Sequence, residues 1–298
     1  TEMTDSTQIN YLTEENSADV VCHRMQNPND PRLAKVMESA IRHLHAFVKE
    51  VEPTYQEWEQ AIEFLTATGQ ICDDKRQEWI LLSDILGISM LVDAINTRRP
   101  ESATENTVLG PFHVQGSPNR EMGDTISDDG QGVPLHISGR VLDTDGNPID
   151  GAVIDAWQAS HDGFYDNQQP DVQPEYNLRG IFQTGEDGRY WYRGVKPCHY
   201  AIPNDGPVGQ MLDAMNRGNM RPAHLHYIVS APGYETITTH IFVNDDPYLT
   251  QDAVFGVKES LIGDFQYHDD PALAAEYNVS NPFWSVKTDF VLTPLKNA

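Results

Sequence analysis

Two histidines one residue apart, His224 and His226, lie in an apolar and β-branched run of the chain. We expect this run to be a strand, on which alternate side chains point to the same face about 6–7 Å apart. At that separation both imidazoles can reach one cation. A second pair with the same spacing, His43 and His45, falls in a helical pattern, where a step of two residues turns the side chain through about 200°. The spacing therefore predicts a metal site on the strand and none on the helix.

Two tyrosines, Tyr165 and Tyr200, occur in predicted loops on either side of the strands that frame these histidines. A tyrosine titrates near pH 10, so a phenolate at neutral pH needs a strong, hard Lewis acid in place of its proton. Ferric iron suits that role better than zinc or magnesium. Two phenolates and two neutral imidazoles leave Fe(III) with a net positive charge and room for further ligands. The four side chains together favour a non-haem ferric site.

Charge and composition argue against several classes of function. The 298 residues include 20 basic and 45 acidic side chains, for a formal charge of −25, which repels phosphate backbones and anionic lipid headgroups. We therefore expect no nucleic-acid partner and no membrane-surface role. The polar start, and the lack of any run near ~20 apolar residues, predict a cytoplasmic protein rather than a membrane protein. Cys22, Cys72 and Cys198 form no C-x-x-C pair and are expected to be reduced and structural.

The elements that must position the four side chains change in type near Pro100. Apolar residues at helical spacing predict helices over residues 31–51 and 53–68, and a third helix from about Trp79 through Leu91 to Asn96. From Leu135 onward, short alternating runs between turn signals predict strands. These strands cover residues 135–142, 152–158, 180–184, 190–193, 224–230, 236–244 and 284–292. The pattern predicts a β-sandwich preceded by a helical N-terminal region.

Five separated motifs, in this order, resemble the intradiol ring-cleaving dioxygenases. They are NTVLGPF at 106–112, GNPIDGA at 146–152, WQA at 157–159, DGFY at 162–165 and RPAHLH at 221–226. The resemblance covers nearly the whole chain, including the helical N-terminal part typical of the catechol and hydroxyquinol branches. It implies a mainly β fold with α: a two-layer β-sandwich catalytic domain over residues 106–298, preceded by a helical dimerisation region over residues 1–105.

By position, the resemblance implies that Tyr165, Tyr200, His224 and His226 bind one non-haem Fe(III) per chain. Tyr200 would also accept a proton from the substrate. Arg221 would stabilise negative charge that develops on the substrate, as a preorganised cation in a dry site can. The implied reaction uses O2 to cleave an aromatic diol between its two hydroxylated carbons, which gives a ring-opened dicarboxylate.

His240 departs from the catechol branch, which more often has glutamine at this position. We place it among the catalytic candidates with two roles open. It orients the metal-bound hydroxide or Arg221, or it is packed and hydrogen-bonded without contacting the substrate.

The resemblance also indicates which residues line the substrate cavity. Most of them are apolar, as a flat aromatic ring requires. These positions are Leu81, Asp84, Val108, Leu109, Gly110, Pro111, Phe112, Ala253 and Val254.

Asp84 is the polar exception, because it lies inside the apolar helical run of residues 79–86. A carboxylate there must be desolvated unless it finds a donor, and a third ring hydroxyl is such a donor. A site that bonds a hydroxyl rejects the analogue that lacks it, because its own polar group is then unpaired. We therefore expect hydroxyquinol (benzene-1,2,4-triol) as substrate, cleaved to 3-hydroxy-cis,cis-muconate or its tautomer maleylacetate. Catechol or a substituted catechol, giving cis,cis-muconate, is the alternative if Asp84 faces solvent or caps a loop.

By the same resemblance, the N-terminal helices pair with those of a second subunit to form a homodimer, and a phospholipid-like amphiphile can occupy an apolar tunnel there. The apolar stripe that begins at Leu33 is compatible with this role. It is equally compatible with a core inside one chain.

Two other classes of protein share some of these features. A β-sandwich binding module, of the transthyretin-like or carbohydrate-binding kind, also has short strands and a Gly-Asn-Pro hairpin, and it would be colourless and free of iron. A zinc hydrolase would combine His224 and His226 with a third histidine, such as His113 or His240, and would use no phenolate ligand. Metal content after Tyr165→Phe separates the last reading from the ferric one.

Overall fold

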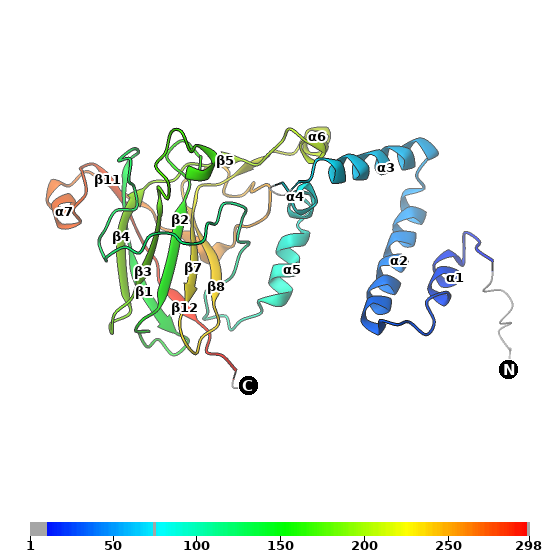
Figure 1. Ribbon diagram of the computed structural model, residues 1–298, viewed down its shortest axis with the longest axis horizontal. Coiled ribbons are helices and arrows are strands. Elements are labelled where there is room, and N and C mark those ends of the chain that lie inside the picture. Colours follow the sequence, from blue (N-terminus) through cyan, green and yellow to red (C-terminus); the bar gives the residue numbers. More distant parts are fainter. Residues whose placement is uncertain (1–10, 74–75, 297–298) are drawn as a thin grey trace. The chain divides into compact units, whose positions relative to one another are not determined.

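The structure is a computed structural model that describes residues 11–73 and 76–296 (Figure 1). Its contacts divide the chain into two compact units, Thr1–Ala67 and Thr68–Ala298. The division falls within helix α3 (Tyr55–Gln70).

The first unit contains helices α1 (Ser17–His23) and α2 (Pro31–Val51) and most of α3. Helix α2 begins where the Asp30 carboxylate accepts a hydrogen bond from the Leu33 backbone N–H and Pro31 occupies the first turn. It ends at Val51 and is followed by Glu52, whose backbone adopts the left-handed conformation with φ 50°. None of the residues of α2 is buried. Among the described residues, no helix is long and apolar enough to cross a membrane.

The second unit begins with two short helices, α4 (Glu78–Ile85) and α5 (Ile88–Asn96). The prediction of one continuous helix through this region was wrong at Gly87. That residue has φ +73°, a left-handed conformation that suits glycine and ends α4 before α5 begins.

Two five-stranded sheets follow and confirm the predicted sandwich. The first sheet contains β1 (Pro134–Asp143), β4 (Arg189–Val195), β10 (Gln266–His268), β11 (Phe283–Lys287) and β12 (Phe290–Leu292). The second contains β2 (Val153–Gln158), β3 (Arg179–Gln183), β7 (His224–Ser230), β8 (Ile237–Val243) and β9 (Ile262–Gly263).

The second sheet runs in the order β3-β2-β7-β8-β9, and in the first sheet β1 pairs with β4, β11 and β12. A separate two-stranded sheet joins β5 (Tyr200–Ala201) to β6 (Met220–Arg221). Shorter elements lie in the connections: the helices α6 (Pro207–Ala214) and α7 (Pro271–Glu276) and the 3₁₀ turns Asp166–Gln168 and Glu259–Leu261.

The core lies between the two sheets, and it fixes which side chains face outward. Ile137 of β1 and Leu225, Tyr227 and Val229 of β7 belong to one buried cluster. Each such fully buried side chain contributes roughly 1.5–3 kcal/mol to the free energy of unfolding. Because side chains alternate along a strand, the even-numbered residues of β7 point away from this core. His224 and His226 therefore lie on the outer face of the second sheet.

Candidate metal centre

Three adjacent strands carry a row of ring side chains on that outer face. The register pairs His226 of β7 with Trp157 of β2 on one side and with His240 of β8 on the other. His224 is paired with Phe242. The β5–β6 ladder places Tyr200 opposite Arg221. These pairings between strands bring residues from distant parts of the chain to one place.

The donor atoms of three of these side chains converge closely. His224 Nε2 lies 3.1 Å from His226 Nε2, and Tyr165 Oη lies 2.6 Å from the same nitrogen. The Tyr200 ring lies 5.8 Å from the Tyr165 ring and 5.7 Å from the His224 ring, centroid to centroid. The four predicted ligands therefore come together in the folded chain.

His240 joins the same cluster. Its ring centroid is 4.6 Å from that of His224 and 4.4 Å from that of His226. In the described part of the chain, these three histidines are the only group of three or more His, Cys, Asp or Glu side chains close enough together to hold a metal ion. The helical His43 and His45 belong to no such group, and His45 Nδ1 lies 2.9 Å from Ser17 Oγ. His113 is not a member of this group. Its Nε2 instead lies 2.9 Å from Asp155 Oδ2.

The protonation of the histidines suits metal binding. His224 Nδ1 is 2.7 Å from the Pro222 carbonyl oxygen, which can only accept, so Nδ1 carries the proton and the Nε2 lone pair faces the cluster. Burial, with the nearby charge of Arg221, lowers the pKa of His224 to about 3. Burial and the neighbouring histidines likewise lower the pKa of His226 and His240 well below the usual value. Neutral imidazoles are the form that binds a metal.

Tyr165 is held in a dry, aromatic setting. Its ring stacks on Phe112, with centroids 4.4 Å apart and planes at 19°. Burial first, and then the neighbouring Tyr200, raise the pKa of the Tyr165 phenol well above its ordinary value. Loss of this proton at neutral pH therefore requires a strong cation in the cluster.

Several buried nitrogens in this cluster lack partners. His226 Nδ1 and both ring nitrogens of His240 have no hydrogen-bond partner among the residues that the structure describes. The nearby backbone of Val108 acts to raise the pKa of His240, but the larger effect of burial outweighs it. Unpaired buried polar atoms mark a place where a bound group belongs. With the converging lone pairs and phenols, they make the cluster fit a metal ion.

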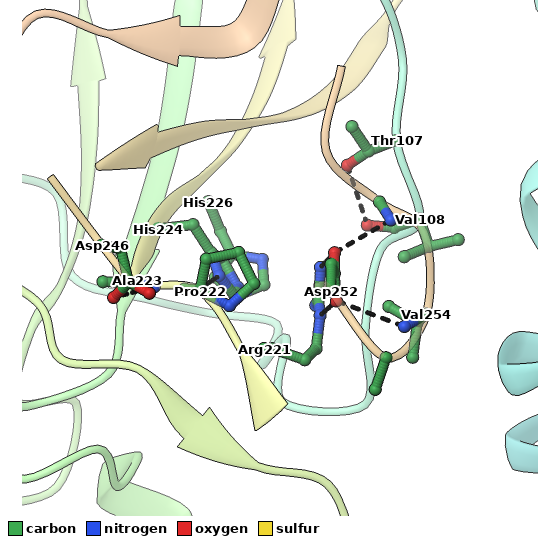
Figure 2. Close-up of polar contacts among 12 residues, drawn as sticks. Thr107, Val108, Arg221, Pro222, Ala223, His224, His226, Asp246, Asp252 and Val254 are labelled. Carbon is green, nitrogen blue, oxygen red and sulfur yellow. Dashed lines mark hydrogen bonds and ion pairs between the residues drawn. The ribbon is translucent and has the colours of Figure 1, made fainter. Parts of the chain in front are cut away.

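Arg221 is buried beside this cluster and is held by a residue that the sequence analysis missed. Its Nε and Nη2 donate to the two oxygens of Asp252 at 3.1 and 3.3 Å (Figure 2). Asp252 also accepts hydrogen bonds from the backbone N–H groups of Val254 and Gly256. Both side chains of the ion pair are at least 95% buried. The signal available in the sequence was weak, because Asp252 follows the polar Thr250 and Gln251 and only precedes an apolar run.

A second buried ion pair positions the loop that carries Tyr165. Arg179 of β3 donates from Nε to Asp166 Oδ1 at 2.8 Å, and Asp166 Oδ2 accepts from the Tyr176 backbone N–H. Asp166 directly follows Tyr165, so the pair restrains that ring. The charge of Arg179 also acts to lower the pKa of Tyr165, against the larger effect of burial.

A cavity of about 550 Å³ opens beside Phe112. Seven of the predicted substrate contacts line it: Leu81, Asp84, Val108, Leu109, Gly110, Pro111 and Phe112. Gly110 has φ +77°, and a Cβ added there would lie 3.5 Å from His226 Cε1. That distance is an ordinary contact, so the left-handed backbone rather than lack of space favours glycine at this position.

The remaining two predicted contacts are placed differently. Ala253 and Val254 are buried but do not line this cavity, and Ala253 borders another hollow beside Arg217. Asp84, by contrast, does line the cavity. Burial raises its pKa, while contacts with Ser89 and the charge of Arg221 act in the opposite direction. Asp84 is thus a partly desolvated acceptor among the residues that line the cavity.

Comparisons with known proteins agree over nearly the whole chain. Residues 108–294 match the family described as "Dioxygenase", and residues 30–104 match "Catechol dioxygenase N terminus". The chain is 60% identical to hydroxyquinol 1,2-dioxygenase of Rhizobium sp. (strain MTP-10005), over 95% of this chain and 96% of that protein.

Solved structures agree with this result. A hydroxyquinol 1,2-dioxygenase from Pseudomonas putida DLL-E4 is 48% identical with a TM-score of 0.90, over 95% of this chain and 99% of that one. A catechol 1,2-dioxygenase from Acinetobacter sp. ADP1 is 29% identical with a TM-score of 0.79, over 96% and 95% of the two chains.

Proposed function

The chain belongs to the intradiol dioxygenase family, and from this premise we propose that it cleaves hydroxyquinol with O2 to 3-hydroxy-cis,cis-muconate, the enol tautomer of maleylacetate. The position of Asp84 carries the choice of substrate. Asp84 lines an otherwise mostly apolar cavity, where a third ring hydroxyl can donate to its carboxylate. Catechol, which gives cis,cis-muconate, lacks that hydroxyl and leaves Asp84 with Ser89 but without the hydrogen bond from the substrate.

The metal in this proposal is one Fe(III), bound by Tyr165, Tyr200, His224 and His226. Three of these donor atoms already lie within 3.1 Å of a neighbouring donor, and both imidazoles are neutral. When bound, ferric iron supplies a Lewis acid that replaces phenol protons and draws electron density from the diol. Zinc, the metal of the hydrolase alternative, has no comparable preference for phenolate.

The protein residues then have separate roles. Phe112 and the apolar wall exclude water and orient the ring, while Asp84 selects the edge with the third hydroxyl. Tyr200 Oη accepts a hydroxyl proton of the substrate. Arg221, fixed by Asp252, presents its charge where negative charge develops on the substrate. His240 packs against His224 and His226, and neither of its ring nitrogens has a hydrogen-bond partner among the described residues, which favours the role that acts on the cluster over the hydrogen-bonded packing role.

Initial rates of O2 uptake test the substrate assignment. The purified, iron-replete protein should consume O2 with hydroxyquinol at least about 100-fold faster than with catechol at equal concentration. Comparable rates, or a preference for catechol, would keep the dioxygenase reaction and discard hydroxyquinol as the preferred substrate.

Removal and return of metal test the iron assignment. The chelated protein should lose O2 uptake and visible colour, and ferrous salt followed by air oxidation should restore both. Zinc should restore neither. Protein that binds zinc in preference to iron, with a zinc content unchanged by Tyr165→Phe, would favour the three-histidine site of His224, His226 and His240 and would contradict the ferric proposal.

The helical region is proposed as a dimerisation region over residues 1–105, with the catalytic domain over residues 106–298. Helix α2 supports this, because it has no buried residue, and its apolar Leu33, Leu44 and Phe47 are more than half exposed. The same stripe could hold a phospholipid at the dimer interface. Light scattering that gives a monomer mass would remove the dimer. A cytoplasmic location is part of the proposal, and the three unpaired cysteines fit a reducing compartment.

A further inference from the structure

The outer face of the first sheet carries a groove that the ring-cleaving site does not use. His136, Ser138 and Arg140 of β1 point away from the core, because Leu135, Ile137 and Val141 point into it. The metal cluster lies on the outer face of the other sheet, so the two sites are separated by both layers of the sandwich (Figure 1).

Positive charge gathers in this groove. The register places Arg140 directly opposite Arg189 of β4, and Ser138 opposite Lys287 of β11. Like charges directly opposite each other destabilise a sheet. In a chain with a formal charge of −25, such a cluster of cations is unexpected from composition alone.

The cations of the groove are poorly neutralised. Arg140 and Arg189 approach carboxylates only at 3.9 and 3.8 Å, on the exposed surface. Arg193 donates to two backbone carbonyls, those of Gly123 and Asn278. Neither Arg193 nor Lys287 has an ion-pair partner within residues 11–73 and 76–296. Exposed ion pairs such as those of Arg140 and Arg189 contribute about 0–1 kcal/mol to stability, so both guanidinium groups remain available to a ligand.

These side chains surround a cavity of about 800 Å³. Its lining contains four cations, Arg140, Arg189, Arg193 and Lys287, and two carboxylates, Asp124 and Glu276. Asp124 Oδ2 is already occupied by the Glu121 backbone N–H. The balance of the lining is therefore positive.

Aromatic rings lie between the charged ends of the groove. His136 stacks on Tyr277, which follows α7, with centroids 3.9 Å apart and planes at 8°. His136 is only 8% exposed, so one edge of its ring reaches the cavity. Trp191 is 42% exposed and also lines the cavity. These surfaces suit a flat, conjugated group.

The spacing of the charges limits the ligand further. Arg193 lies opposite His136, and Arg140 lies four residues farther along β1, which is about 13 Å of strand. Because arginine side chains are long and flexible, the two guanidinium groups can lie closer together than this length of strand. A ligand with an anionic group at each end and a flat middle matches this order of cation, ring and cation. The two lining carboxylates disfavour a nucleic acid, which presents phosphate along its whole length.

We propose that this groove binds a small, conjugated dicarboxylate, with one carboxylate at Arg140 and Lys287 and the other at Arg193. This groove is separate from the candidate metal ligands, and the proposal that it binds a dicarboxylate does not depend on hydroxyquinol being the substrate. The ring-opened product of an intradiol cleavage belongs to the same chemical class.

Calorimetric titration of the iron-loaded protein tests this site. The probes are trans,trans-muconate and sorbate, two six-carbon dienes that differ by one carboxylate. At low ionic strength, muconate should bind at least tenfold more tightly than sorbate. The double variant Arg140→Gln/Lys287→Gln should weaken muconate binding at least tenfold and leave initial O2 uptake unchanged.

A matched double variant, Arg98→Gln/Lys296→Gln, removes two exposed cations outside the groove and so changes the net charge equally. It should bind muconate within twofold of the unchanged protein. Equal losses in both double variants would mean that only overall charge matters and would overturn the site. Equal binding of sorbate, or displacement of muconate by inorganic phosphate at equal concentration, would overturn the dicarboxylate assignment. Muconate binding that survives in the groove variant would place the ligand elsewhere.

Discussion

The imidazole of His226 lies almost flat against the indole of Trp157, with ring centroids 4.8 Å apart and planes at 12°. Trp157 is 2% exposed, and its Nε1 has no hydrogen-bond partner among the described residues. Its other neighbour is the His113 ring at 4.7 Å. The indole therefore acts on His226 through its flat surface and fixes the plane of that ring. Trp157 is a positioning residue for a proposed metal ligand.

Trp157→Leu removes this flat surface and should lower metal affinity about 10–100-fold, the range found when a ligand loses its outer support. Trp157→Phe keeps a ring against the imidazole and should retain most of the affinity. Iron content and the visible absorption band, measured across a chelator titration, report the change. Trp191→Leu, on the other sheet, is the control and should behave like the unchanged protein. Equal iron retention in the Leu and Phe variants would contradict the positioning role.

Asp84→Leu should change substrate preference more than total activity. The variant cannot accept a hydrogen bond from the third ring hydroxyl, so kcat/KM for hydroxyquinol should fall at least about 100-fold. The value for catechol should stay within a few fold, because catechol makes no such contact. Asp84→Asn keeps an acceptor and should fall between the two. Parallel losses for both substrates would show that Asp84 acts on the fold or on Arg221 rather than on the third hydroxyl.

Asp252→Asn should be strongly destabilising. Burial alone would raise the pKa of Asp252, but the charge and hydrogen bonds of Arg221 outweigh it and hold this pKa below its usual value. Loss of the carboxylate leaves the buried Arg221 without a counterion, which costs about 3–5 kcal/mol of unfolding free energy. Urea unfolding measures this loss.

Asp205→Asn serves as its control, because Asp205 is 70% exposed where it pairs with Arg76. The expected loss there is about 0–1 kcal/mol. If Asp252→Asn still folds at low temperature, kcat should fall more than KM rises, since Arg221 would act on charge that develops during the reaction. Losses of similar size in the two variants would contradict the role given to Asp252.

The buried His136 should make stability depend on pH. Burial, and then the charge of Arg193, lower the pKa of His136 from 6.5 to about 4. The unfolded chain therefore binds this proton first as the pH falls, so the contribution of neutral His136 is complete above about pH 6.5 and is lost progressively toward pH 4. Between pH 7 and pH 5 the loss is about 2 kcal/mol.

His136→Phe keeps a ring against Tyr277 and removes the titration. The variant should lose about 2 kcal/mol less than the unchanged protein between pH 7 and pH 5, as measured by urea unfolding in chloride buffers. Unfolding free energies that fall in parallel for the two proteins would show that His136 is not the responsible group.

Local patterns in the sequence were enough to predict the strand face, the helical N-terminal region and the chemistry of the ligands. Strand β7 occupies residues 224–230 as predicted, and alternation along it places His224 and His226 on one face. The pKa of a phenol and the preferences of hard cations identified Tyr165 and Tyr200 as candidate partners. The strand prediction succeeded because it depends on one short segment, whereas the metal and its tyrosine ligands stay predictions.

Only the tertiary structure decided which distant residues support that site. The stack of Trp157 on His226, the approach of His240 and the pairing of Arg221 with Asp252 all depend on strand register or on loops that return from elsewhere in the chain. The basic groove likewise exists because β1 pairs with both β4 and β11. Periodicity determines which face a side chain occupies, whereas its neighbours on that face are fixed by packing between segments that are far apart in sequence.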